Sequence, residues 1–298
     1  MTRSTWLVAF RLRTLPLSLA SIGMGGFLAA SRGRFDVLVF TLCCLTTVFL
    51  QILSNLANDY GDTVHGADHE GRTGPRRTVQ SGAIPLGTMR RAMLLFVVLS
   101  FASGVSLLLA AFGLDFRLLS IFLGLGLLAI AAAVTYTAGS KPYGYAGLGD
   151  VSVLVFFGFI GVTGSLFLFI KEIAWWSLLP AIACGFFSMG VLNINNIRDM
   201  ESDRLAGKYS IPVRVGRKWA GYYHWLLSLG GMLAAVLYTG IHFQSVYQFL
   251  FLLSMPLFLA IGVAVNQKPA SQLDPYLKRM AMATLLFVLL FGVGQLIS

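Results

Sequence analysis

Two groups of Asn and Asp side chains have the spacing that places oxygen ligands on one face of a helix. The first group comprises Asn55, Asp59, Asp62 and the nearby Asp68, and the second comprises Asn195, Asp199 and Asp203. Residues three or four positions apart lie along the same helical face. Carboxylates at a helix C-terminus repel one another and the negative end of the helix dipole. A hard divalent cation relieves both repulsions, and oxygen-only ligands favour Mg²⁺ or Ca²⁺ over zinc.

Basic residues follow both groups. A loop containing Arg72 comes after the first, and a loop containing Lys208 comes after the second. Acidic clusters beside basic loops suit a substrate with several negative charges that is held through metal, and a diphosphate has this character. Mg²⁺ typically binds one or two carboxylates together with substrate phosphates. The alternative is that both segments are ordinary solvated loops that end membrane helices.

The composition predicts that these groups lie at the ends of membrane helices. The 298 residues are 57% hydrophobic and only 11% charged, which is too apolar to cover a soluble protein of this size. A membrane span needs about 20 apolar residues. Nine spans are predicted, at 14–31, 37–58, 92–114, 118–140, 151–170, 173–197, 219–241, 246–267 and 280–297.

The distribution of basic residues predicts the orientation. With the N-terminus in the cytoplasm, the outside segments contain only Arg32, Arg34, Arg117 and Lys171, and the other 18 of the 22 Lys and Arg residues lie inside. Cytoplasmic loops carry such an excess, so the C-terminus is expected outside and both acidic groups at the cytoplasmic face. The net charge of +10 then reflects membrane orientation and anion binding rather than binding of nucleic acid.

The acidic groups also predict the organisation of the fold. Asp59 ends the second predicted span and Asp199 ends the sixth, four spans later, and both follow an Asn by four positions. Repeats of this kind often place a site between the two halves. We expect an all-α membrane protein with nine transmembrane helices, arranged as two four-helix units plus a ninth helix in a single domain over residues 1–298.

The loop over 136–150 is rich in Gly and Tyr. It contains Tyr136, Lys141, Tyr143 and Asp150. An aromatic acid would suit this loop, because Lys141 can pair with a carboxylate and tyrosine rings can stack on an aromatic system. We therefore assign these four residues to binding of an acceptor. The alternative is an aromatic belt at the membrane interface with a tight turn.

These residues resemble a known family. Asn-Asp-Tyr-Gly-Asp at 58–62 and Asn195-x3-Asp199-x3-Asp203 resemble the two aspartate-rich motifs of the UbiA superfamily of intramembrane aromatic prenyltransferases. The resemblance covers nearly the whole chain and includes Arg11-Leu-Arg13-Thr-Leu-Pro16. Many members have a third Asp where this chain has Gly66, and here the Asp comes at 68. The stretches 50–62 and 191–199 are most similar to the menaquinone-pathway branch of the family.

The resemblance implies a large central cavity open to lipid, Mg²⁺ as cofactor and a polyprenyl diphosphate as substrate. It implies Asp59, Asp62, Asp199 and Asp203 as metal ligands, with Asp68 as a further one, and neutral contacts from Asn55 and Asn195. Arg72, Lys208 and Arg11 would contact the diphosphate. The menaquinone branch implies 1,4-dihydroxy-2-naphthoate as acceptor, loss of CO₂, and a place in the bacterial cytoplasmic membrane with the site facing the cytoplasm.

Other functions leave different patterns. A secondary transporter would carry acidic residues within its spans, whereas here they gather at the span ends. An intramembrane phosphatidyl-alcohol transferase would need one compact Asp-rich signature rather than two. Within the prenyltransferases, 4-hydroxybenzoate, homogentisate or haem are alternative acceptors.

Overall fold

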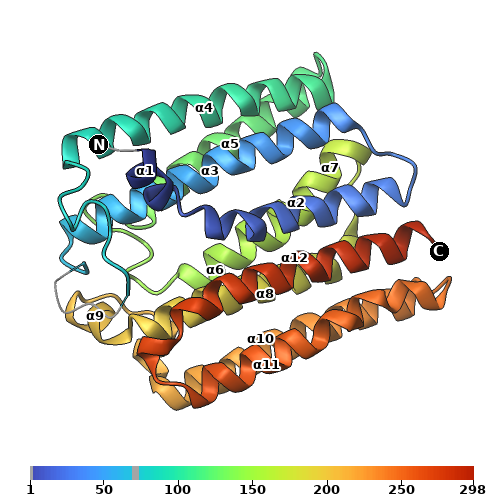
Figure 1. Ribbon diagram of the computed structural model, residues 1–298. Helices are drawn as coiled ribbons and strands as arrows, with labels where there is room; N and C mark the ends of the chain where they lie inside the picture. The colour runs from blue at the N-terminus through green and yellow to red at the C-terminus, as the bar shows by residue number, and fades with distance from the viewer. Residues whose placement is uncertain (1–2, 69–73) are drawn as a thin grey trace.

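The computed structural model describes residues 3–68 and 74–298. All regular secondary structure in this part of the chain is helical, with nine helical segments long and apolar enough to cross a membrane. The segments are Ser4–Ala30, Val37–Val64, Leu86–Phe112, Phe116–Thr135, Gly149–Ile170, Trp175–Arg198, Ile211–Ile241, Val246–Gln267 and Asp274–Leu296. The predicted all-α membrane fold is confirmed, including the break in the long apolar run over 219–267, which falls after Ile241. The termini lie at opposite ends of the bundle (Figure 1).

Several spans are built from more than one helical piece. The first combines α1 (Arg3–Phe10), η1 (Leu12–Thr14) and α2 (Leu15–Ala30), and the fifth combines α6 (Gly149–Val153), the π-helical η2 (Leu154–Gly164) and α7 (Ser165–Ile170). The sixth combines η3 (Trp175–Ser177) with α8 (Leu178–Arg198), and the eighth combines η4 (Val246–Ser254) with α11 (Met255–Gln267). The others are α3 (Val37–Val64), α4 (Leu86–Phe112), α5 (Phe116–Thr135), α10 (Ile211–Ile241) and α12 (Asp274–Leu296), and two short helices, α9 (Met200–Leu205) and η5 (Ala270–Gln272), lie outside the spans.

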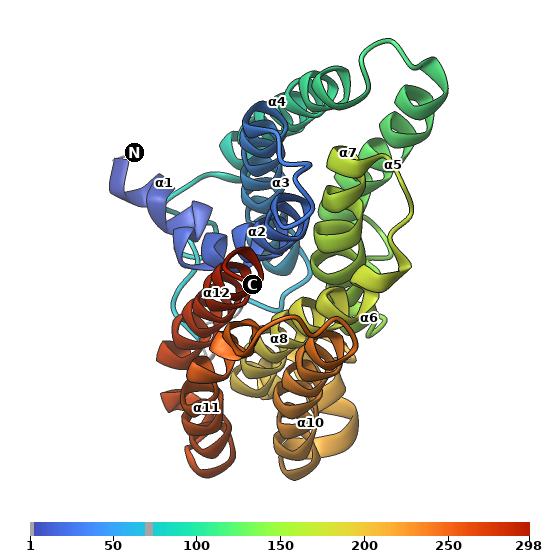
Figure 2. The ribbon, with the colours of Figure 1, turned by 90° about the vertical axis from the view of Figure 1, so that its right-hand side faces the viewer.

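The helices form two groups joined by the first, fifth and ninth spans. The helices α3, α4 and α5 pack against one another, and α8 packs against α10, which packs against α11. Figure 2 shows these groups at the top and bottom of the bundle, with α2 and α12 between them. The ninth helix, α12, contacts α8 and η4 of the second group and also α2, which in turn contacts α3 of the first group.

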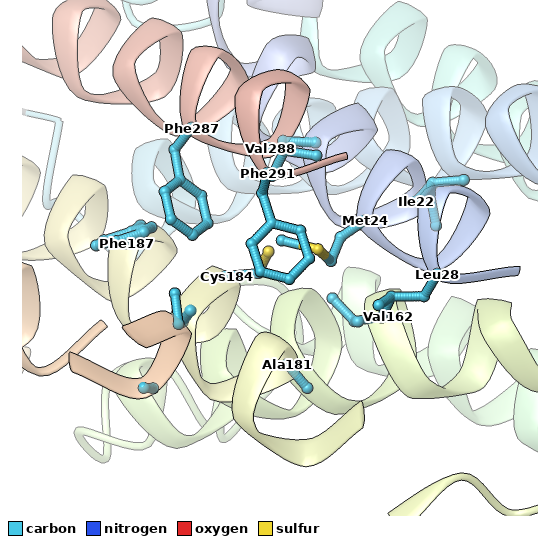
Figure 3. Close-up of a cluster of buried hydrophobic side chains, with 14 of the residues drawn as sticks. Ile22, Met24, Leu28, Val162, Ala181, Cys184, Phe187, Phe287, Val288 and Phe291 are labelled. Carbon is cyan, nitrogen blue, oxygen red and sulfur yellow. The ribbon is translucent and has the colours of Figure 1, made fainter. Parts of the chain in front are cut away.

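Large apolar side chains fill the centre of the bundle where α2, α8 and α12 meet. Phe187 of α8 and Phe287 of α12 pack edge to face with ring centroids 4.9 Å apart, and Phe291 and Met24 lie beside them (Figure 3). In a membrane, such van der Waals packing is a main force that holds helices together. The packing fixes α8, at whose C-terminal end the second acidic group begins.

One helix is left open. Among the described residues, α5 has none that is buried, and residues 124–128 are all exposed. Five consecutive residues cover more than one full helical turn, so no side chain of this stretch is buried, although α5 packs against α3 and α4.

Several helices extend further than their apolar stretches predict, and two of these extensions bear on the acidic groups and the loops after them. The helix α3 continues past 58 to Val64, and α10 begins at Ile211 instead of 219, with a break at Gly216, whose φ is 81°. Hydropathy marks only the part of a helix inside the hydrocarbon, and polar turns outside it remain helical. The longer α3 places Asp59 and Asp62 within its last two turns.

Candidate active site

The first acidic group lies on the last turns of α3 and is nearly excluded from solvent. Asp59 and Asp62 are each 2% exposed. Asp59 Oδ2 accepts hydrogen bonds from the Thr78 backbone N–H (3.3 Å) and from the Thr78 hydroxyl. The other oxygen of Asp59, Oδ1, is buried and has no hydrogen-bond partner among the described residues. Asp59 is therefore anchored through one oxygen while the second is available to a ligand.

Asn55, one turn before Asp59, holds the N-terminal segment. Its Nδ2 donates to the Phe10 carbonyl (2.9 Å) and to Thr14 Oγ1 (3.2 Å). Arg11 lies between these two contacts in a left-handed backbone conformation, with φ 48° and ψ 53°. Non-glycine residues adopt this conformation rarely, so the start of the first span turns sharply beside the acidic group.

Arg77 is the counter-ion of the first group. Its Nη1 lies 2.6 Å from Asp62 Oδ2, its Nε lies 3.2 Å from Asp68 Oδ1, and it also donates to the Asn58 carbonyl (2.8 Å). Burial by itself would lower the pKa of Arg77, but the carboxylates of Asp62 and Asp68 raise it above its ordinary value. Arg77 therefore stays charged. The predicted phosphate ligand of this loop, Arg72, lies outside the described residues.

The second group begins where α8 ends. The helix stops at Arg198, Asp199 lies in a turn, and α9 carries Asp203, so the predicted column over 195–203 is divided between two helical pieces. Asp199 and Asp203 are each 3% exposed, and Asn195 is half-buried. Arg198 binds both oxygens of Asp199, at 2.9 and 2.7 Å.

Lys208 is the counter-ion of Asp203, with Nζ 3.4 Å from Asp203 Oδ1. The second oxygen, Oδ2, has no hydrogen-bond partner within the described part of the chain. Burial, with Asp199 and Asp62 nearby, raises the pKa of Asp203 to about 6, although Lys208 opposes this. Since Asp62 contributes to this shift, the two acidic groups lie within electrostatic reach of each other, as the spacing of the motifs predicts.

The loop over 136–148 lies between the two groups. Tyr145 donates its hydroxyl hydrogen to Asp62 Oδ1 at 2.9 Å, and the Lys208 ammonium lies 5.7 Å from the centre of its ring. The Tyr209 backbone N–H donates to the Tyr145 carbonyl at 3.0 Å, which ties the loop after α9 to this one. Tyr145 thus contacts both halves of the site.

The four predicted acceptor residues are placed differently from one another. Burial raises the pKa of the Tyr136 hydroxyl to about 12. The charges of Lys208, Asp62 and Asp150 also act on this pKa, so Tyr136 lies near both acidic groups. Asp150 is buried and accepts a hydrogen bond from Tyr223 (2.9 Å). Tyr143 donates to the Ala132 carbonyl (2.9 Å) and packs its ring on Tyr136. Lys141 is exposed, so the fold brings Tyr136 and Asp150 toward the acidic groups and leaves Lys141 at the surface.

A cavity of about 340 Å³ opens between α1, α3, α8 and the loop before α4. Its polar lining consists of Arg11, Arg13, Asp59, Arg76, Arg77, Thr78, Asn195 and Arg198, and its apolar lining of Leu7, Val8, Leu12 and Pro75. Residues from both acidic motifs therefore line one cavity. Arg77, Thr78 and Arg198 are functional candidates that the sequence reasoning did not select, although Arg77 belongs to the basic loop that it did select.

The donor set fits a hard divalent cation. Among the described residues, no three His, Cys, Asp or Glu side chains are close enough together to hold a metal ion, and Arg77, Arg198 and Lys208 are paired with the carboxylates. However, Asp59 Oδ1 and Asp203 Oδ2 are buried and have no hydrogen-bond partner in the part of the chain that the structure describes. Such atoms are costly unless something binds them, and oxygen donors are those that Mg²⁺ prefers.

The fold and these carboxylate motifs are those of the UbiA prenyltransferase family, to which the chain belongs: the model of this family matches residues 18–293. The chain is 47% identical to the 1,4-dihydroxy-2-naphthoate octaprenyltransferase of Haemophilus influenzae, in an alignment that covers 98% of this chain and 96% of the relative. It is 44% identical to the Escherichia coli enzyme of the same name, with 98% and 95% covered.

Solved structures agree with the fold. The apo structure of a UbiA homologue from Aeropyrum pernix K1 superposes with a TM-score of 0.69 at 17% identity, covering 97% of this chain and 98% of the other. A UbiA homologue from Archaeoglobus fulgidus bound to GPP and Mg²⁺ superposes with a TM-score of 0.66 at 16% identity, covering 99% and 100%. At these identities the likeness establishes the nine-helix architecture alone.

Proposed function

We propose that this chain is a multi-pass 1,4-dihydroxy-2-naphthoate polyprenyltransferase. It transfers a polyprenyl group from polyprenyl diphosphate to 1,4-dihydroxy-2-naphthoate, with loss of CO₂ and diphosphate, and so makes demethylmenaquinol for menaquinone biosynthesis. The observation that carries the proposal is the meeting of buried carboxylates from α3 and α9 around Arg77, Lys208 and Tyr145. The two relatives that are 47% and 44% identical and bear this activity in their names support the choice of acceptor.

The carboxylates are proposed to hold Mg²⁺. Asp59, Asp62, Asp199 and Asp203 are the ligands, and Asp68 is a further candidate, because Arg77 already brings its carboxylate to the site. Bound Mg²⁺ neutralises the charge that develops on a departing diphosphate. Asn55 and Asn195 supply neutral contacts, and the hydrogen bonds of Asn55 to Phe10 and Thr14 fix its orientation.

The basic residues are proposed to change partners when substrate binds. Arg77 pairs with Asp62 and Asp68, and Lys208 pairs with Asp203. When these carboxylates turn to the cation, the N–H groups of Arg77 and Lys208 become available to phosphate oxygens, to which charged donors bind strongly. Arg11, which lines the cavity, and Arg72 are proposed to contact the same diphosphate.

The acceptor is proposed to bind beside the loop over 136–148. Tyr136 and Tyr143 offer ring surfaces, Asp150 lies behind them, and Lys141 is the proposed partner of the carboxylate. Cleavage of the carbon–oxygen bond of the allylic diphosphate leaves an allylic cation. The ring carbon that carries the carboxylate forms the new carbon–carbon bond, and the electrons of the bond to the departing CO₂ return to the ring.

The orientation is part of the proposal. The carboxylate site lies at the end of the bundle that carries α9 (Figure 1), and most Lys and Arg residues follow or precede spans at that end. Such an excess is typical of cytoplasmic loops. We therefore place the N-terminus and the active site on the cytoplasmic side of a bacterial inner membrane and the C-terminus outside.

The choice of acceptor is tested by competition. Purified protein in lipid nanodiscs receives labelled polyprenyl diphosphate, Mg²⁺ and an equimolar mixture of 1,4-dihydroxy-2-naphthoate, 4-hydroxybenzoate and homogentisate. The proposal predicts that nearly all label appears in the prenylated naphthalene product. Label in prenylated 4-hydroxybenzoate or homogentisate would assign the chain to a different branch of the family.

A further inference from the structure

Arg198 connects the second acidic group to the start of α12. Its Nε and Nη2 hold the two oxygens of Asp199, Nη2 also donates to Asn195 Oδ1 at 2.8 Å, and Nη1 binds Asp274 Oδ1. The side chain is 2% exposed. A buried guanidinium needs such a complete set of partners, because an unpaired buried charge is very costly.

Asp274 is the residue that completes this set from a distant part of the chain. It occupies the first turn of α12, and its second oxygen, Oδ2, binds Arg13 Nη1 at 2.9 Å. Arg13 and Arg198 line the cavity, whereas Asp274 does not. The four residues form a row of alternating charge, Arg13, Asp274, Arg198 and Asp199, which crosses from the first span through the ninth to the end of the sixth.

The arrangement bears on the availability of Asp199. Arg198 neutralises Asp199 and thereby competes with any cation for the same two oxygens. Asp274 gives Arg198 a second anionic partner, so the guanidinium keeps a counter-ion when Asp199 turns away from it. Without Asp274, release of Asp199 would leave Arg198 as a buried charge with only the neutral oxygen of Asn195, which is strongly unfavourable.

We propose that Asp274 is a positioning residue for Asp199, acting through Arg198 so that Asp199 can exchange its guanidinium partner for a divalent cation. This inference rests on the proposed function, which makes Asp199 a metal ligand. Partners outside the ligand shell commonly set metal affinity in this way, and their loss typically weakens binding about 10- to 100-fold.

The test measures cation affinity directly, without turnover. The purified full chain is titrated with Mn²⁺ in the absence of substrate, and free Mn²⁺ is followed by electron paramagnetic resonance. Asp274→Asn keeps the size and an acceptor oxygen for Arg198 but removes the charge. It is expected to raise the Mn²⁺ dissociation constant about tenfold, and Asp274→Glu is expected to restore most of the affinity.

A matched control separates positioning from simple support of the fold. Asp115 caps α5 by accepting hydrogen bonds from the Arg117 and Leu118 backbone N–H groups. Asp115→Ala should lower the melting temperature and leave Mn²⁺ affinity unchanged. If Asp274→Asn behaves like Asp115→Ala, with lower melting temperature and wild-type Mn²⁺ affinity, Asp274 only ties helices together and the inference is overturned. If the wild-type chain binds Mn²⁺ no better than Asp199→Asn, the proposed metal site itself is wrong.

Discussion

Arg77 and Asp62 form an ion pair with 2.6 Å between Nη1 and Oδ2, and this pair fastens the loop before α4 to the last turn of α3. Both side chains are almost fully buried, at 10% and 3% exposed. Arg77 also reaches Asp68 and influences Asp59 and Asp199 electrostatically. The same guanidinium therefore neutralises several carboxylates of the site and, since it also lines the cavity, is placed to meet a phosphate.

Replacing Arg77 should destabilise the protein in a way that a divalent cation repairs. Arg77→Gln removes the guanidinium that Asp62 and Asp68 share, and breaking a buried pair typically costs about 3–5 kcal/mol. We expect a lower melting temperature in EDTA and a larger rise on adding Mg²⁺ than in the wild type. Arg90→Gln is the control, since Arg90 is exposed and donates a hydrogen bond to the Tyr60 hydroxyl, away from the carboxylates. An equal response to Mg²⁺ in both variants would contradict the placement of metal beside Arg77.

The carboxylates proposed as metal ligands should be essential for transfer. Asp59→Asn and Asp199→Asn should each lower turnover at least about a hundredfold, because loss of metal-assisted stabilisation is worth several kcal/mol. Glu201 lies between Asp199 and Asp203 in sequence, but it is exposed and pairs with Arg204. The Glu201→Gln variant should therefore keep wild-type activity. The test measures turnover of each variant at saturating Mg²⁺, with circular dichroism to check folding. A near-normal rate in either Asp variant would show that this carboxylate is not a metal ligand.

Replacing Lys208 and replacing Lys141 should change the Michaelis constants for different substrates. Lys208 is buried against Asp203, and Lys208→Met should raise the Michaelis constant for polyprenyl diphosphate about tenfold or more, as expected for a lost hydrogen bond to a charged group. Lys141→Met should instead raise the constant for the naphthoate and leave that for the diphosphate unchanged. Separate kinetics for the two substrates test both. Wild-type kinetics for Lys141→Met would mean that Lys141 only anchors the loop at the membrane surface.

Gly61 allows α3 to approach the loop over 136–148 closely. A Cβ atom at this position would lie 2.3 Å from the Thr137 carbonyl oxygen, so Gly61→Ala must push the loop away and disturb the hydrogen bond from Tyr145 to Asp62. We expect a stability loss of about 1–3 kcal/mol, typical of overpacking, together with lower activity. Gly87→Ala in α4 meets open space and should keep full activity. A fully active and stable Gly61→Ala protein would show that the loop adjusts freely.

Hydropathy and spacing predicted much of this molecule, because a membrane dictates span length and a helix dictates which residues share a face. The nine spans and the position of Asp59 and Asp62 near the end of one helix follow from these local rules. The pairings of Arg77 with Asp62, Arg198 with Asp274 and Tyr145 with Asp62 could not be predicted. Their partners are 15, 76 and 83 positions apart, and only helix packing and loop geometry decide which of several charged residues meet. The exposure of Lys141 depends on the geometry of its loop in the same way.

The central claim is that this chain joins a polyprenyl group to 1,4-dihydroxy-2-naphthoate at the carbon that loses CO₂. The most direct measurement uses 1,4-dihydroxy-2-naphthoate labelled with ¹⁴C in the carboxyl group, polyprenyl diphosphate and purified protein in nanodiscs. The account predicts one released ¹⁴CO₂ for each prenylated product, dependent on Mg²⁺ and absent in Asp199→Asn. Prenylated product that retains the label, or no product at all with folded protein and Mg²⁺, would contradict it.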